Sequence, residues 1–81
     1  GCPDDVVYLI RRNTMVKAYR YGEVIGISSK SFEDAVRNGI EEADKIVKGK
    51  LRWFEVKEER GRIEDGKIAE FQATLKIGYT V

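Results

Sequence analysis

The sequence predicts an α+β fold in which a three-stranded antiparallel sheet packs on one amphipathic helix, in the order strand, helix, strand, strand. Apolar residues recur every three or four positions in the middle of the chain, and every second position in the flanking segments. A helix on one face of such a sheet leaves the other face bare. The chain has only 81 residues, and a domain of this size buries only about 60% of the surface that its unfolded chain exposes. We therefore expect copies of the chain to cover the bare face.

The first strand is expected over Lys17 to Ile25, a segment rich in tyrosine and valine. Gly22 interrupts this segment. A glycine inside a strand often marks a bulge or the close approach of another backbone. We expect one of these two features at Gly22.

One amphipathic helix is predicted from Ser31 to about Val47. Ser31 is the expected N-cap, with Asp34 three positions later, and the acidic side chains of the first turn suit the positive end of the helix dipole. Gly49 marks the end of the helix. The apolar positions that should face the sheet are Phe32, Val36, Ile40, Ala43 and Val47.

Two further strands follow and form a hairpin. From Ala69 to Tyr79 the apolar residues occupy the odd positions, which is typical of a strand with one buried face. The other strand is predicted from Leu51 to Arg60, where Phe54 and Val56 share the face that we expect to pack on the helix. Gly61 to Gly66 should form the connecting loop, with Glu-Asp-Gly at its end as the turn signal.

Residues 1–14 fit this plan poorly, and we assign the domain itself to residues 15–81. Two aspartates precede an apolar run from Val6 to Ile10, two arginines follow, and Met15 stands in a position suited to a start codon. We interpret residues 1–14 as an upstream extension or a cloning remnant. The alternative is that Val6 to Ile10 forms an extra edge strand.

The composition argues against several classes of protein. The 15 lysines and arginines nearly balance the 14 acidic residues, and the charges alternate in sign instead of forming a basic stripe, so nucleic acid is not an expected partner. No apolar run approaches the roughly 18 residues of a membrane helix. With no histidine and one cysteine, Cys2, neither a metal site nor an internal disulfide is expected. We predict a cytoplasmic protein that binds no membrane and has no Cys/His metal site.

Catalysis is not expected either, and we assign no catalytic residue. Histidine, the commonest general base near neutral pH, is absent, and the single thiol lies in the N-terminal segment. Ser28 and Ser29 precede Lys30, but such a group before a helix is typical of loop and capping contacts. Gly26 and Gly39 have a spacing that matches no phosphate-binding glycine loop.

Three residues are candidates for ligand binding. Trp53 and Phe54 are neighbours on one strand and face opposite ways, so Trp53 should lie on the bare face. Gln72 points away from its apolar neighbours and should share that face. An indole and an amide together suit a flat heteroaromatic ring with donors and acceptors at its edge, and Arg60 suits a phosphate. The alternatives are a core tryptophan, and a glutamine and an arginine that are simply solvated.

Several short segments occur in a recognisable order. They are Gly26-Ile27-Ser28, Ser31-Phe32-Glu33-Asp34-Ala35, Trp53-Phe54-Glu55-Val56, Arg60-Gly61 with Ile63 and Gly66, and Phe71-Gln72 through Lys76-Ile77-Gly78-Tyr79. In this order and spacing the chain from Val16 to about Tyr79 resembles the dodecins.

The resemblance implies a strand-helix-strand-strand subunit, twelve of which form a hollow shell that binds flavins in pairs near two-fold axes. It also implies that Trp53 stacks on the isoalloxazine ring of FMN or riboflavin, that Gln72 contacts the pyrimidine edge, and that Arg60 contacts a phosphate. Flavin storage or buffering would then be the function. A shell that binds coenzyme A or another nucleotide, and a structural assembly without ligand, are the alternatives.

The sequence departs from many bacterial dodecins near its C-terminus. Those members carry an arginine just after the glycine–aromatic pair, where this chain has Thr80 after Gly78 and Tyr79. We therefore expect Arg60 to be the chief phosphate contact.

Overall fold

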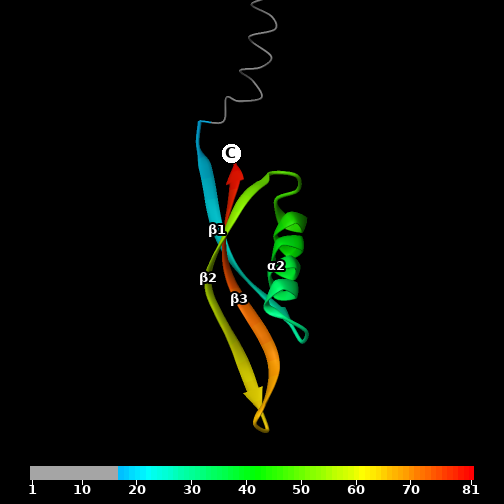
Figure 1. Ribbon diagram of the computed structural model, residues 1–81. Coiled ribbons are helices and arrows are strands. Elements are labelled where there is room, and N and C mark those ends of the chain that lie inside the picture. Colours follow the sequence, from blue (N-terminus) through cyan, green and yellow to red (C-terminus); the bar gives the residue numbers. More distant parts are fainter. Residues whose placement is uncertain (1–16) are drawn as a thin grey trace, which may run out of the picture.

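The computed structural model describes residues 17–81 (Figure 1). Their elements are β1 (Tyr19–Ser28), α2 (Phe32–Ile46), β2 (Leu51–Glu64) and β3 (Lys67–Thr80). The strands form one antiparallel sheet in the order β1-β3-β2. The predicted α+β fold, with its order strand, helix, strand, strand, is confirmed. Residues 1–14 lie outside the described residues, and their interpretation stays a prediction.

The helix begins where its capping residues predict. The Ser31 hydroxyl accepts a hydrogen bond from the Asp34 backbone N–H at 3.0 Å, which satisfies a donor that has no partner within the helix. The Ser28 hydroxyl donates to the Asp34 carboxylate at 2.7 Å, so this serine takes part in capping as expected. At the other end α2 stops at Ile46, close to the predicted end, and Gly49 follows with a φ of 71°.

The helix packs against the sheet through small residues. Gly26 of β1 lies against Ala35 and Gly39 of α2, and a Cβ at Gly26 would come within 1.9 Å of the Ala35 carbonyl oxygen. Among the described residues, the buried apolar core consists of Ala35, Ala73, Leu75 and Ile77. Three predicted contact residues lie beside this core and are only partly buried: Val36, Ile40 and Ala43. The contact is therefore centred on Ala35 and Gly39, which the apolar periodicity did not single out.

The first strand is regular throughout, contrary to the prediction for Gly22. Gly22 pairs with Ile77 in an unbroken register, and a Cβ at Gly22 would meet nothing within 4 Å. Neither a bulge nor a close contact occurs at this glycine. The close approach falls at Gly26 instead, because that is where α2 packs on β1. β1 also continues to Ser28, beyond the predicted end.

The hairpin is longer, and its loop tighter, than predicted. β2 continues through Gly61, which pairs with Phe71, so the loop expected from residue 61 onward is wrong. Only Asp65 and Gly66 lie between the strands, with φ values of 53° and 75°. Two consecutive residues with positive φ are typical of a type I′ turn, whose twist matches that of the flanking strands. The Asp-Gly signal marks the turn, and pairing extends up to it.

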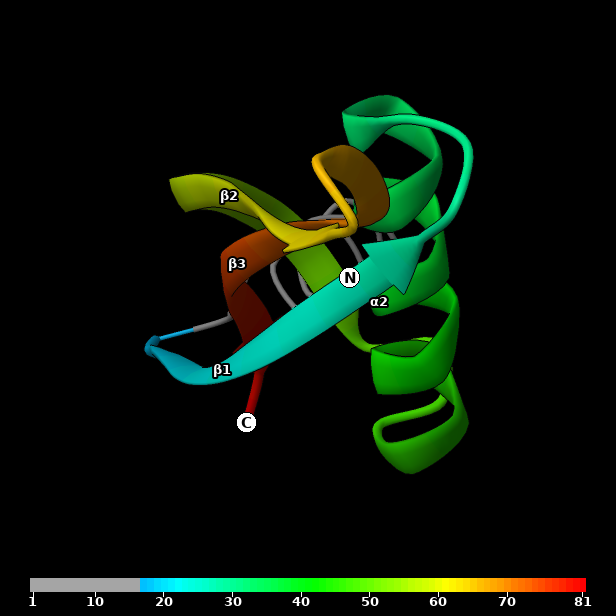
Figure 2. The same cartoon turned by 90° about the horizontal axis from the view of Figure 1, so that it is seen from below.

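β2 lies at an edge of the sheet, on the side away from the helix (Figure 2). By register Phe54 pairs with Ile77 and Val56 with Leu75, so both point to the helix side of the sheet. They do not pack on the helix, however, because Phe54 is 51% exposed and Val56 is 38% exposed. The prediction that this pair packs on the helix within one chain is wrong. The physical reason is that α2 covers β1 and β3 and barely reaches β2.

Candidate functional site

The candidate site is the sheet face that points away from the helix, which we call the open face. Its residues follow from the register, since directly paired residues of adjacent strands share a face. They are Gln72, Thr74, Lys76 and Gly78 on β3, Tyr21, Glu23, Ile25 and Ile27 on β1, and Trp53, Glu55, Glu58 and Arg60 on β2. The open face therefore holds all three residues that the sequence singled out for ligand binding.

Trp53 lies opposite Gly78, and its indole occupies the space above that glycine. A Cβ on residue 78 would come within 2.0 Å of the indole Cε2 and within 2.3 Å of Cζ2. Gly78 is therefore buried beneath the ring, whereas Trp53 itself is 39% exposed. An indole that rests on backbone and keeps an open surface offers a platform for a second aromatic ring.

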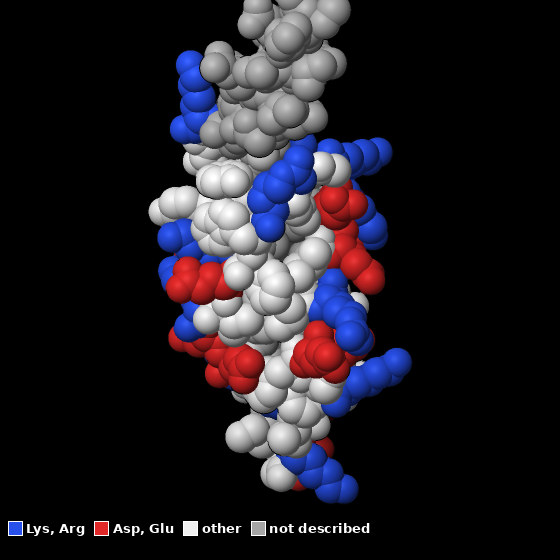
Figure 3. All heavy atoms as spheres, turned by 45° about the horizontal axis from the view of Figure 1, so that its top comes forward, with Lys and Arg blue, Asp and Glu red and all other residues white. Residues whose placement is uncertain are grey.

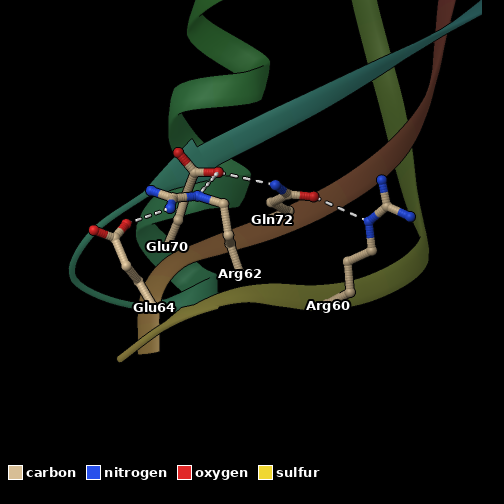
Figure 4. Close-up of polar contacts among 5 residues, drawn as sticks. All are labelled: Arg60, Arg62, Glu64, Glu70 and Gln72. Carbon is tan, nitrogen blue, oxygen red and sulfur yellow. Dashed lines mark hydrogen bonds and ion pairs between the residues drawn. The ribbon is translucent and has the colours of Figure 1, made fainter. Parts of the chain in front are cut away.

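Gln72 and Arg60 form a cross-strand pair farther along the open face (Figure 4). Arg60 Nε donates a hydrogen bond to Gln72 Oε1 at 2.9 Å, and Gln72 Nε2 donates one to Glu70 Oε1 at 2.9 Å. Arg62 links Glu70 to Glu64, with an Nε to carboxylate distance of 3.8 Å on one side and an Nη1 hydrogen bond of 2.7 Å on the other. The residues proposed for ring-edge and phosphate recognition are thus in direct contact.

Trp53 and Gln72 share a face but are not close together within one chain. Gly78, the partner of Trp53, is six residues from Gln72 on β3, which corresponds to about 20 Å along a strand. The indole lies over Gly78, and the Gln72 amide bonds to Glu70, on the side away from the indole. A ring stacked on Trp53 therefore does not reach the Gln72 amide of the same chain.

Charged side chains occupy the middle of the open face. Lys57 of β2 reaches across β3 and donates a hydrogen bond to the Glu23 carboxylate of β1 at 2.6 Å. This hydrogen bond and the attraction of the Glu23 charge raise the pKa of Lys57 above its ordinary value. The Lys76 ammonium lies 4.2 Å from the centre of the Tyr21 ring, a cation–π contact. A polar strip thus separates the tryptophan from the glutamine.

The described surface combines uncharged residues with charges of both signs. Figure 3 shows uncharged residues running lengthwise along one side, flanked by basic and acidic side chains. Within residues 17–81, no group of three or more His, Cys, Asp or Glu residues is placed to hold a metal ion. In the same part of the chain, no helix has the length and apolar character needed to span a membrane. The chemistry offered by the open face is stacking at Trp53 and hydrogen bonding at Gln72 and Arg60.

Reasoning from the sequence missed two residues of this site. Gly78 makes room for the indole, and Glu70 holds the Gln72 amide. The period-two pattern gave a signal for both, because it places them on the same side of the strand as Gln72. Their partners on β2 depend on the register between two strands, which three irregularities shift along the hairpin.

Comparisons with known proteins agree with this architecture. The sequence model of the Dodecin family matches residues 18–81. The dodecin of Thermus thermophilus is 37% identical over 65 residues, which cover 80% of this chain and 93% of that protein. The similarity therefore extends over nearly the whole described region.

Solved structures of dodecins have the same fold as this chain. The Streptomyces coelicolor dodecin has 44% identity and a TM-score of 0.75, over 79% of this chain and 90% of that chain. For the Streptomyces davaonensis dodecin the identity is 41% and the TM-score 0.74, over 79% and 93% of the two chains. A calcium dodecin from Mycobacterium tuberculosis shares the fold, with a TM-score of 0.70 and 24% identity, over 80% of this chain and 91% of that chain.

Fold and open face thus define a small β-α-β-β protein with one uncovered sheet face. The chain belongs to the dodecin family.

Proposed function

We propose that this protein binds a flavin, riboflavin or FMN, and stores or buffers it within a homo-oligomeric shell of twelve chains. The observation that carries the proposal is the exposed indole of Trp53, which rests on Gly78 in the open face. A supported indole with a free surface favours stacking of a flat aromatic ring. The isoalloxazine ring is flat and has hydrogen-bonding groups along its pyrimidine edge, which suits an amide such as Gln72.

Assembly is supported by the apolar surface that one chain leaves uncovered. The core of the described chain contains only four buried apolar residues: Ala35, Ala73, Leu75 and Ile77. Large apolar side chains remain exposed on both sides of the sheet, with Ile25 and Ile27 on the open face and Phe54 on the other. Burial of apolar surface stabilises by about 25 cal/mol per Å², so association adds stability that one small core lacks. The number twelve is the expectation for a dodecin.

The proposed site is shared between copies of the chain. Trp53 and Gln72 lie about 20 Å apart along one chain, so a flavin that contacts both takes the indole from one copy and the amide from another. Two-fold symmetric association brings the same surface of two copies together and lets residues from different positions meet. Assembly and binding are therefore coupled in this proposal.

Arg60 is assigned to the phosphate of FMN. Its Nε is bonded to Gln72, which leaves the two terminal guanidinium nitrogens, one of them facing Glu58, to contact a phosphate. The Arg60 side chain is 59% exposed, and a Glu58 carboxylate lies 3.8 Å away. Partly exposed charge pairs contribute less than about 1 kcal/mol. Preference for FMN over riboflavin should therefore be modest.

Fluorescence titration of the purified protein tests the proposal. Riboflavin and FMN should both lose emission on binding, as a stacked flavin does, and sedimentation should show one large assembly. Binding of coenzyme A with no flavin binding would favour the nucleotide alternative. An assembly that binds none of the three would be structural, and the flavin proposal would be wrong.

A further inference from the structure

The Gln72 amide is held at both ends by charged residues of its own chain. Arg60 Nε donates to Oε1 at 2.9 Å, and Glu70 Oε1 accepts from Nε2 at 2.9 Å (Figure 4). A side-chain amide can normally turn over and exchange its oxygen with its nitrogen. Here the exchange would set the amide NH₂ against a guanidinium and the amide oxygen against a carboxylate.

That exchanged arrangement is excluded by chemistry. A guanidinium only donates hydrogen bonds, and an ionised carboxylate only accepts them. Both contacts are lost on exchange, whereas both are satisfied, and both are charge-assisted, in the observed orientation. Arg60 and Glu70 together therefore fix which side of the Gln72 amide carries the oxygen.

The fixed amide keeps one N–H and one oxygen lone pair for a ligand. An amide has two donors and two acceptor lone pairs, and the contacts to Glu70 and Arg60 use one of each. Because the amide cannot turn over, the side that carries the remaining N–H and the side that carries the remaining lone pair are set. A ring edge with a carbonyl next to an N–H is complementary to them, and the imide of a flavin has this pattern.

We propose that Arg60 and Glu70 are positioning residues that orient the Gln72 amide and make it selective for a ring edge carrying a carbonyl beside an N–H. This inference rests on the proposed flavin binding. Glu70 is the better test of the two, because Arg60 is also assigned to phosphate. The Glu70 side chain is 24% exposed and forms an ion pair with Arg62, whose Nε lies 3.8 Å from the carboxylate, so the carboxylate is held beside the amide.

Two matched substitutions separate positioning from charge. Glu70→Gln keeps the size of the side chain but can donate as well as accept, so the Gln72 amide keeps its contact with Arg60 and loses the acceptor that fixes its nitrogen side. Glu64→Gln removes the same charge from the same network, at a carboxylate that bonds to Arg62 and not to Gln72. Riboflavin affinity should fall about two- to tenfold in Glu70→Gln, the range of one displaced hydrogen bond, and should stay unchanged in Glu64→Gln.

Two further measurements show whether Glu70 acts through the amide. In the Gln72→Ala background, Glu70→Gln should have no additional effect on riboflavin affinity. Riboflavin methylated at the imide nitrogen lacks the N–H, so it should bind the parent more weakly and be insensitive to Glu70→Gln. Sedimentation of every variant checks that the assembly is intact.

The outcomes distinguish the two proposals. A parent protein that binds no riboflavin overturns the flavin proposal itself. A parent that binds riboflavin, with equal affinities in Glu70→Gln and the parent, overturns only the positioning role. Equal losses in Glu70→Gln and Glu64→Gln, or a loss that persists without Gln72, also overturn it, because Glu70 would then act through charge or structure.

Discussion

At the scale of single residues, Trp53 and Arg60 each have a neighbour that sets what they offer a ligand. The Trp53 indole is supported by the backbone of Gly78, which leaves one part of the ring free for stacking. Arg60 donates its Nε to Gln72, which leaves its terminal nitrogens for a phosphate. Stacking should therefore supply most of the affinity. Arg60 should affect ring binding through Gln72 and phosphate binding through its terminal nitrogens.

Trp53→Ala should weaken riboflavin binding by at least about tenfold, because aromatic stacking contributes about 0.5–1.5 kcal/mol beyond the apolar area that is buried. Trp53→Phe should give an intermediate loss, since a smaller ring still stacks. Quenching of riboflavin fluorescence measures both affinities, and sedimentation checks that the variants assemble. A Trp53→Ala protein that assembles and binds riboflavin as tightly as the parent would show that the indole does not stack on the ligand.

Arg60→Ala should weaken FMN binding more than riboflavin binding. The affinity for riboflavin should fall about two- to fivefold, because the Gln72 amide loses one hydrogen bond. The affinity for FMN should fall a few-fold more. This additional loss should disappear as the salt concentration rises from about 50 to 500 mM, because the screening length shortens to a few ångströms. Arg60→Lys keeps the charge without the Nε geometry, so it should restore the FMN preference and not the riboflavin affinity. Equal losses for both flavins at low salt would exclude a phosphate contact.

At the scale of elements, the helix and β1 are joined through glycine contacts. Gly26 meets the Ala35 carbonyl, and Gly39 lies against Gly26 and Leu75. This contact fixes the distance between α2 and the sheet, and so decides which strands the helix covers. The edge strand β2 stays uncovered on both faces as a consequence, and its exposed residues are free for contacts with other chains.

Gly26→Ala and Gly22→Ala form a matched pair on β1. The Cβ at Gly26 would collide with helix backbone at 1.9 Å, so this variant should lose about 3 kcal/mol or more of unfolding free energy. The Cβ at Gly22 meets nothing within 4 Å, so Gly22→Ala should be neutral or gain up to about 1 kcal/mol. Urea unfolding at one fixed protein concentration measures both. Similar stabilities would show that α2 can shift without cost.

At the scale of the whole molecule, the proposed binding site belongs to the assembly. One chain carries a stacking residue and an edge-recognition residue on the same face, but about 20 Å apart. Its small core and exposed apolar side chains favour association. A single chain should therefore be both marginally stable and unable to hold a flavin as proposed.

Mixed assemblies of Trp53→Ala and Gln72→Ala chains test the shared site. If the two residues of a site come from different copies, random mixing of equal amounts restores about a quarter of the sites to full affinity. If they come from the same chain, no site in the mixture contains both residues. Co-refolding of the two variants, followed by riboflavin titration, gives the fraction of tight sites. A mixture without tight riboflavin sites would exclude a site that takes Trp53 from one copy and Gln72 from another.

The sequence alone determined the order of elements, the cap at Ser31, the Asp-Gly turn and the sides of the strands. These features depend on contacts between residues close in sequence and on apolar periods of 3.6 and two residues. The order of residues in the chain specifies both directly. The same periodicity placed Trp53, Arg60 and Gln72 on one face.

Only the tertiary structure decided how these pieces meet. The packing of Gly26 on Ala35 left Phe54 exposed, and the register of β2 on β3 set Trp53 over Gly78 and Arg60 against Gln72. Each of these contacts joins residues of different elements, and their pairing is fixed by bulges and by the volume of small residues between backbones. Periodicity gives the side of a strand on which a residue lies, but the partner across the sheet is determined by packing.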